Sequence, residues 1–190
     1  MSNWKVVEMK ELAPGIVVFD NIFPDSMDFI KEIARQDIQW RPAEVGIDDK
    51  TSGVKTSARD TDIIVLQDTP DILGDLTRSF RSHMMPCLNE YRNLYGAGIE
   101  EYQDPQLLRY GLGQKFIDHI DDSPRLTRRI SLTYYLNDDY EGGDVEFRRF
   151  GLRFKAQKNQ LLLFPSNFVY NHQVHPVTDG LRYVIVQWMA

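Results

Sequence analysis

The sequence predicts an α+β protein, mainly β, in which two helices precede a long series of short strands. Apolar residues recur at helical spacing in two segments of the first 100 residues, and from Gln106 onward short apolar runs alternate with turn signals. Many short strands at such spacing indicate a sandwich or barrel, and helices that precede them would cover one outer face of the sheet. We expect a single domain over 1–190, with a support region over 1–100 and a β core over 105–190.

The first expected elements are a short strand at Ile16–Phe19 and a helix that ends near Gln36. Phe23-Pro24-Asp25-Ser26 has the proline and the capping side chains of a helix start. The apolar stripe of this helix consists of Phe29, Ile30, Ile33 and Ala34. The segment Ala43–Asp60 is polar and contains glycines, so we expect a long loop or a weak hairpin, a kind of segment that often serves binding.

A strand at Ile63–Leu66 leads to a second helix, which Asp68-Thr69-Pro70 opens and Gly96 ends. Pro86 lies inside this helix and should kink or split it, because proline has no N–H to donate. We interpret Met84, Met85 and Cys87 as core residues and His83 as a surface or capping residue.

The later part of the chain consists of strand-like runs separated by turn signals such as Asn137-Asp138-Asp139, Gly142-Gly143 and Thr178-Asp179-Gly180. The expected strands are Gln106–Tyr110, Arg129–Leu136, Val145–Phe147, Leu152–Phe154, Gln160–Phe164, Gln173–Val177 and Arg182–Trp188.

The composition, with 42% hydrophobic and 26% charged residues, is that of a globular protein with one core. Cys87 is the only cysteine, which excludes an intrachain disulfide and favours a reducing, cytoplasmic setting. The net charge of −6 makes nucleic acid and anionic membranes poor partners, and we expect neither a signal peptide nor a membrane span. Two basic clusters are interpreted as solvated faces: Arg125, Arg128 and Arg129, and Arg148, Arg149, Arg153 and Lys155.

The candidate metal ligands are His119, Asp121 and His172. In an extended strand, residues i and i+2 point to the same side, so His119 and Asp121 can offer a nitrogen and an oxygen to one ion. His172 lies near the start of the expected penultimate strand and supplies the third ligand. Two histidines and one carboxylate form the facial triad of non-haem Fe(II) oxygenases, which leaves the opposite side of the ion open.

Arg182 raises the specificity of this pattern, since His-x-Asp alone occurs often by chance. It follows His172 across the turn Thr178-Asp179-Gly180, so we expect the two residues on adjacent, hairpin-linked strands that both face the interior. A deeper arginine can bind a carboxylate with two parallel hydrogen bonds. A diacid that chelates iron at one end and needs a buried cation at the other is 2-oxoglutarate. The alternative is a strand-edge charge paired with Asp179.

Three segments resemble the prolyl 4-hydroxylase branch of the 2-oxoglutarate/Fe(II) oxygenase superfamily. They are YGLGQKFIDHID, SLTYYLNDDYEGGDVEF and LLLFPSNFVYNHQVHPVTDGLRYVIVQW, and they extend from about Leu107 to Trp188. The short chain looks like the bacterial or phage-type members. The resemblance implies a double-stranded β-helix, or jelly roll, flanked by N-terminal helices.

The resemblance also implies roles by position. His119, Asp121 and His172 match the iron ligands, Arg182 matches the basic residue that binds the distal carboxylate of 2-oxoglutarate, and Tyr110 and Tyr135 match residues of the same pocket. Gly142-Gly143 matches a turn that a bulky side chain would obstruct, Val177 would be a wall contact, and Trp188 would lie near the mouth or in the core.

Several alternatives stay open. Asp122 adjoins Asp121, but strand alternation and the spacing of the family favour Asp121. His175 is near His172, but His172 fits the spacing to Arg182 better, so we interpret His175 as a substrate-side or surface residue. Tyr134 and Tyr135 point to opposite faces, so only one of them can line the pocket. Candidate substrate residues are Lys55, in Lys55-Thr56-Ser57, which resembles an Arg-Thr-Ser segment of a substrate loop, then Arg128, Trp188, Trp40 and Arg41.

The expected function is hydroxylation of a substrate C–H bond, with succinate and CO₂ as coproducts. The favoured target is a prolyl residue in a peptide or protein. The expected cofactors are Fe(II), 2-oxoglutarate and O₂, with ascorbate as a supporting reductant. The alternatives are a hydroxylase of a free amino acid or another small molecule and a non-catalytic metal-binding jelly roll.

Overall fold

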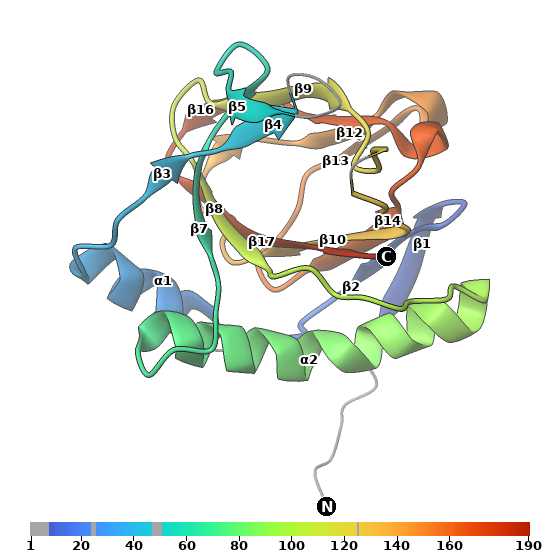
Figure 1. Cartoon of the computed structure of the whole chain (residues 1–190), viewed down its shortest axis with the longest axis horizontal. Helices are drawn as coiled ribbons and strands as arrows, with labels where there is room; N and C mark the ends of the chain where they lie inside the picture. Colours follow the sequence, from blue (N-terminus) through green and yellow to red (C-terminus); the bar gives the residue numbers. More distant parts are fainter. Residues whose placement is uncertain (1–7, 24–25, 47–50, 125) are drawn as a thin grey trace, which may run out of the picture.

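The computed structural model describes residues 8–23, 26–46, 51–124 and 126–190. Two β-sheets face each other, and two helices lie on the outer face of the larger sheet (Figure 1). This arrangement confirms the predicted mainly β, α+β class and the jelly roll with N-terminal helices. The expected helix start at Pro24-Asp25, part of the polar segment (47–50) and Arg125 lie outside the described residues.

The larger sheet is antiparallel, in the order β1-β2-β14-β10-β17-β8-β7-β3. Its strands are β1 (Met9–Ala13), β2 (Ile16–Phe19), β3 (Arg41–Pro42), β7 (Asp62–Val65), β8 (Gln106–Tyr110), β10 (Ile130–Tyr135), β14 (Leu161–Pro165) and β17 (Arg182–Met189). The central strand β17 pairs with β10, where Trp188 lies opposite Ser131, and with β8, where Arg182 lies opposite Tyr110. The expected strands of this sheet are found within one or two residues, and β1 and β3 were not expected.

The smaller sheet has the order β13-β12-β15-β9-β6. Its strands are β6 (Arg59–Asp60), β9 (Lys115–His119), β12 (Val145–Phe147), β13 (Leu152–Phe154) and β15 (His172–Val174). Two further pairs are β4 (Glu44–Gly46) with β5 (Ser52–Val54), and β11 (Glu141–Gly142) with β16 (Val177–Asp179). The polar segment therefore contains the weak hairpin that was one of its two expected forms.

One expected strand is wrong. The segment expected as Gln173–Val177 is divided between β15, which joins the smaller sheet, and β16, which pairs with β11. Pro176 lies between the two and cannot donate a hydrogen bond to a ladder, so the chain leaves one sheet there and enters another pairing. Two short 3₁₀ turns, Arg148–Phe150 and Phe168–Tyr170, complete the β region.

The helices are α1 (Ser26–Arg35) and α2 (Ile72–Tyr95). Asp71 caps α2 by accepting hydrogen bonds from Leu73 N and Gly74 N, and Gly96 ends it in the left-handed conformation (φ 64°). Of the two effects expected at Pro86, a kink or a split, the split is wrong, because α2 continues through the proline. The proline is exposed, whereas the opposite stripe of α2 is buried on the sheet. Among the described residues, no helix has the length and apolar character to cross a bilayer.

The larger sheet separates two hydrophobic cores, one on each of its faces. Leu132 and Tyr134 of β10 pack toward the helices, together with Leu76 and Phe80 of α2. Tyr135 of β10 points the other way, into the space between the two sheets. We refer to these as the helix face and the cavity face, because a cavity with about 480 Å³ of empty space, including its part open to solvent, lies between the sheets.

Candidate metal centre

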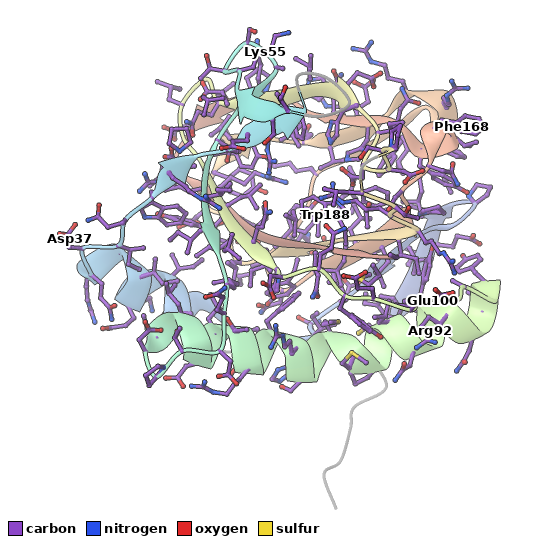
Figure 2. All side chains as sticks on the ribbon, viewed as in Figure 1. Asp37, Lys55, Arg92, Glu100, Phe168 and Trp188 are labelled. Carbon is purple, nitrogen blue, oxygen red and sulfur yellow. The ribbon has the colours of Figure 1, made fainter. Side chains whose placement is uncertain are left out.

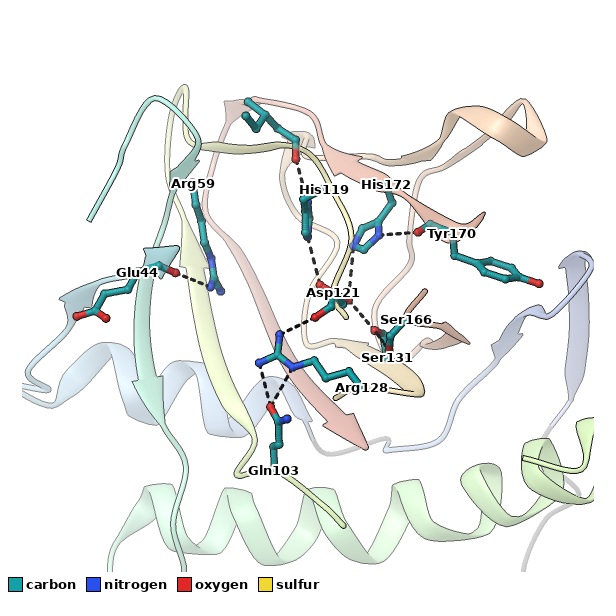
Figure 3. A network of polar contacts seen from close by, with 11 residues as sticks. Glu44, Arg59, Gln103, His119, Asp121, Arg128, Ser131, Ser166, Tyr170 and His172 are labelled. Atoms are coloured by element: carbon teal, nitrogen blue, oxygen red, sulfur yellow. Dashed lines mark hydrogen bonds and ion pairs between the residues drawn. The ribbon is translucent and has the colours of Figure 1, made fainter. Parts of the chain in front are cut away.

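The structure brings His119, Asp121 and His172 together in this cavity. His119 is the last residue of β9 and His172 the first of β15, and the two are cross-strand partners whose ring centroids are 4.3 Å apart. Asp121 lies two residues beyond the end of β9 rather than on the strand, and its carboxylate still turns toward both rings (Figure 3). The candidate ligand atoms all lie within 4.8 Å of one another.

Both imidazoles are oriented by backbone carbonyl groups. His119 Nδ1 lies 2.9 Å from the oxygen of Ile117, and His172 Nδ1 lies 3.1 Å from the oxygen of Tyr170. A carbonyl oxygen can only accept, so each Nδ1 carries the proton and each Nε2 keeps its lone pair. Both Nε2 atoms face Asp121, at 3.3 Å from Oδ1 for His119 and 3.8 Å from Oδ2 for His172. This tautomer is the one that binds a metal through Nε2.

The Asp121 carboxylate is fixed by two serines. Ser131 donates to Asp121 Oδ2 at 2.6 Å, and the Ser166 hydroxyl lies 2.8 Å from that of Ser131. Burial opposes ionisation of Asp121, but the neighbouring imidazoles and the Ser131 hydrogen bond outweigh it and hold the pKa below its ordinary value. Asp121 is therefore ionised, with Oδ1 on the side of His119 and Oδ2 on the side of His172.

His172 is 7% exposed, and this burial lowers its pKa from 6.5 to about 4. The imidazole is thus neutral at physiological pH and needs to lose no proton before it binds a cation. Ligands bound at about 2.1 Å in adjacent octahedral positions are about 3 Å apart. Two nitrogens and one carboxylate oxygen within 4.8 Å of one another are the donor set of a site for a divalent first-row metal such as Fe(II).

Arg182 lies in the same cavity, on the larger sheet, and is 1% exposed. Its guanidinium carbon is 4.9 Å from the ring centroid of Tyr110 and 5.3 Å from that of Tyr135. Burial opposes its charge, yet the tyrosine hydroxyls, Tyr140 foremost, raise the pKa of Arg182 above its ordinary value. The side chain therefore remains a cation inside the protein.

Three buried donors around Arg182 have no acceptor among the described residues. Arg182 Nε, Arg182 Nη1 and the Tyr135 hydroxyl lack a hydrogen-bond partner anywhere in the described part of the chain. Unpaired buried donors are costly, so their presence in a group points to a ligand that completes them. A carboxylate has the acceptor geometry that this group of donors lacks.

Gly143 keeps the space around Arg182 open. It has φ 66°, and a Cβ on it would lie 2.8 Å from Arg182 Cδ and 3.1 Å from the Tyr140 ring. Gly142 (φ 70°) is similarly constrained, since its Cβ would lie 2.3 Å from the carbonyl oxygen of Pro176. The Gly142-Gly143 turn thus allows the chain to reverse against the arginine, as expected. Tyr140, three residues earlier, was missed, although it belongs to the same Tyr-Glu-Gly-Gly run.

The expected hairpin between His172 and Arg182 is wrong. His172 is on β15 of the smaller sheet and Arg182 on β17 of the larger one, so they face each other across the cavity rather than along neighbouring strands. The intervening segment pairs elsewhere, as β16 with β11. His172 and Arg182 nevertheless line the same cavity, as expected.

Two further arginines lie near the metal ligands (Figure 3). Arg128 donates to the Asp121 carbonyl oxygen from Nη1 at 3.1 Å and to Gln103 Oε1 from Nε and Nη2 at 3.1 and 2.9 Å. It also stacks on the Trp188 ring, 3.8 Å from its centroid. Arg59, which was not expected at the site, lines the cavity from β6 and is 9% exposed.

The remaining candidates lie elsewhere. Figure 2 shows Trp188 between the sheets and Lys55 at the edge of the molecule, where Lys55 is exposed. Trp40 packs against Tyr183, on the helix face, and Arg41 is exposed on β3. Three residues of the ambiguous pairs lie outside the metal cluster: His175 hydrogen-bonds Glu146 at 2.8 Å, Asp122 accepts from Arg128 N, and Tyr134 belongs to the helix face. Val177 packs in the core on the cavity side of the sheet.

Comparison with known proteins agrees with this site. Residues 105–190 match the profile of the 2OG-Fe(II) oxygenase superfamily. A PKHD-type hydroxylase from Colwellia psychrerythraea is 28% identical over 125 residues, which are 60% of this chain and 55% of the relative. One from a Synechococcus strain is 33% identical over 90 residues, 42% of this chain and 39% of the relative. The chain therefore spans about half or less of the length of these curated relatives.

Solved structures establish the likeness in fold over most of the chain. A prolyl hydroxylase from Trichoplax adhaerens, in complex with a hypoxia-inducible-factor peptide fragment, superposes with a TM-score of 0.75 at 18% identity and covers 92% of this chain and 83% of its own. A prolyl-4-hydroxylase from Pseudomonas putida gives a TM-score of 0.68 at 17% identity, with 92% and 91% covered. Both likenesses concern the arrangement of the strands and helices.

Proposed function

We propose that this chain is a 2-oxoglutarate-dependent dioxygenase that hydroxylates a C–H bond, because residues 105–190 match the profile of the 2OG-Fe(II) oxygenase superfamily. The observation that supports this most is the combination, in one cavity, of a two-histidine, one-carboxylate cluster and a buried arginine with unpaired donors. A metal-binding module alone has no use for the second feature. We further propose that the target is a prolyl residue, as in the prolyl hydroxylases of similar fold.

The roles of the chain's residues follow from their positions. His119 and His172 would present Nε2, and Asp121 a carboxylate oxygen, to Fe(II). Arg182 and the Tyr135 hydroxyl would bind the distal carboxylate of 2-oxoglutarate, with Tyr110 and Tyr140 around it. When bound, Fe(II) with 2-oxoglutarate and O₂ supplies the oxidation, in which one oxygen atom enters the C–H bond and the other enters succinate as CO₂ leaves. The two sheets keep bulk water away from these residues.

The test begins with anaerobic protein and Fe(II). Addition of 2-oxoglutarate should give a weak visible charge-transfer band in the wild type, and none in Asp121→Ala or His172→Ala, because these variants lose a ligand. Succinate release should depend on the same residues. A variant without Asp121 that still binds Fe(II) and forms succinate at the wild-type rate would refute the assignment. A wild type that binds the metal without the band or succinate would be the non-catalytic module.

Substrate choice is tested by succinate release across proline-containing peptides and free amino acids. Stimulation by a peptide with an internal proline supports the prolyl residue. A second candidate, hydroxylation of a free amino acid, is favoured by one observation: Arg59 places a further cation in the cavity, suited to a small substrate with its own carboxylate. Stimulation by free amino acids alone would select that candidate.

A further inference from the structure

Arg59 is a buried cation whose bonding is incomplete. It is 9% exposed, and its Nε has no hydrogen-bond partner within the described residues. Its Nη1 donates to the carbonyl oxygen of Glu44 at 3.3 Å, and no carboxylate of the described residues forms an ion pair with it. A buried charge without a counter-charge is unfavourable, because neither water nor an anion replaces its lost hydration.

The position of Arg59 is fixed by the fold. On β6 it lies opposite Phe116 of β9, and its guanidinium carbon is 5.1 Å from the Phe116 ring centroid. Phe116 in turn stacks on His119, with ring centroids 3.5 Å apart and planes at 17°. The guanidinium is thus held at the side of the metal cluster that the His119 ring borders, within the same cavity (Figure 3).

In a site that holds Fe(II) and 2-oxoglutarate, the positive charge of Arg59 would have no negative charge among the described residues to balance it. Iron(II), the Asp121 carboxylate, the doubly charged 2-oxoglutarate and Arg182 balance one another. Arg128 has protein acceptors for three of its nitrogens, and the Asp122 carboxylate accepts from its backbone N–H. The pKa of Arg128 is lowered chiefly by burial and further by the charge of Arg59, so the two cations are close enough to repel each other. A neutral substrate would leave this positive charge uncompensated.

We infer that Arg59 binds a carboxylate of the primary substrate, and so selects substrates that carry an acidic group near the residue or molecule that is hydroxylated. This inference rests on the proposed function and specifies its substrate class. The carboxylate can come from a free amino acid or a chain terminus, or from an acidic side chain that flanks a prolyl residue. In each case it forms the charge-assisted hydrogen bond that Arg59 Nε lacks.

The experiment measures binding rather than turnover. Protein loaded with Mn(II) and saturated with 2-oxoglutarate is titrated by calorimetry, without O₂, with pairs of probes that differ only in the carboxylate. The pairs are L-proline and L-prolinamide, N-acetyl-L-proline and its amide, and the capped tripeptides acetyl-Ala-Pro-Glu-amide and acetyl-Ala-Pro-Gln-amide. We expect the acidic member of at least one pair to bind about tenfold or more tightly.

The variants locate the effect. Arg59→Gln should remove the preference for the acidic probe, whereas Arg59→Lys should keep part of it. Arg153→Gln removes the same charge from an exposed site of the smaller sheet (β13) and should leave the preference unchanged. Thermal unfolding of each variant checks that it is folded.

The pair that responds identifies the source of the carboxylate. An equal preference in wild type and folded Arg59→Gln overturns the inference, and so does the absence of any preference in the wild type across all pairs. Binding of 2-oxoglutarate to the Mn(II)-loaded wild type is recorded in the same samples. If it is present, failure concerns Arg59 alone; if it is absent, the proposed function itself fails.

Discussion

The two faces of the larger sheet differ in how completely their polar groups are paired. On the helix face, the Tyr134 hydroxyl donates to the carbonyl oxygen of Phe23 and lies 3.0 Å from Asn159 Oδ1. On the cavity face, the buried hydroxyl of the neighbouring Tyr135 has no hydrogen-bond partner among the described residues, and neither do two nitrogens of Arg182. Folding alone gains nothing from such unpaired groups. The helix face therefore stabilises the fold, and the cavity face has hydrogen-bond donors that a ligand can satisfy.

The largest expected effect is on the helix face. Phe80→Ala removes a side chain that is 1% exposed and packs near Tyr134, with ring centroids 6.2 Å apart. It should lower the free energy of unfolding by about 3–5 kcal/mol. Denaturant unfolding measures this loss, and the folded fraction should bind 2-oxoglutarate as the wild type does. A large loss of affinity in the folded fraction would show that the faces are not separable.

The converse change is on the cavity face. Arg182→Met should weaken 2-oxoglutarate binding about 100-fold or more, because the ligand carboxylate loses its cation. Metal binding should remain, and the Tm of the ligand-free protein should change little, because the variant removes the burial cost of the charge together with its interactions with the surrounding tyrosine hydroxyls. Calorimetry with Mn(II)-loaded protein and thermal unfolding check both halves. A fall in Tm comparable to that of Phe80→Ala would contradict the division between the faces.

The next effect concerns acid. His172 has a pKa of about 4 in the folded protein against 6.5 ordinarily, so between these values the unfolded chain binds more protons than the folded one. The free energy of unfolding of metal-free protein should therefore be constant above about pH 6.5 and fall by about 2 to 3 kcal/mol toward pH 4. Urea unfolding at a series of pH values measures the slope. In His172→Gln most of this slope should vanish, and an unchanged slope would assign it to other groups.

The smallest effect compares adjacent residues. Tyr135→Phe should weaken 2-oxoglutarate binding about tenfold with little change in Tm, because the lost hydroxyl forms no hydrogen bond within the part of the chain that the structure describes. Tyr134→Phe should leave that affinity unchanged and cost about 1 kcal/mol of stability, because it breaks a buried hydrogen bond. Equal behaviour of the two variants in both assays would mean that strand alternation does not divide their roles.

Much of this division could be predicted from sequence, because it depends on local periodicity. The helical stripe of α2 indicated the helix face, and the alternation of Tyr134 and Tyr135 placed them on opposite faces. The pattern His119-x-Asp121 needs only two residues of extended chain to bring both groups to one side. The predicted roles of these residues in binding iron and 2-oxoglutarate stay proposals.

The errors concern features that depend on distant pairing. Whether the chain around Pro176 continues in one sheet or changes to another is decided by its partners, and no local pattern reports them. Arg59 looks like a polar loop residue, and only the pairing of β6 with β9 buries it against Phe116. Trp40, in contrast, was expected at the opening, and its contact with Tyr183 places it on the helix face.

The cross-strand position of His119 and His172 gives the ion a second consequence. An ion held by both would join β9 to β15, two strands that are three to five residues long and come from distant parts of the chain. The bound ion would stabilise the pairing of these two strands, and their amide protons should exchange with solvent more slowly once it is bound. Metal supply would then govern the integrity of this wall as well as the chemistry it encloses.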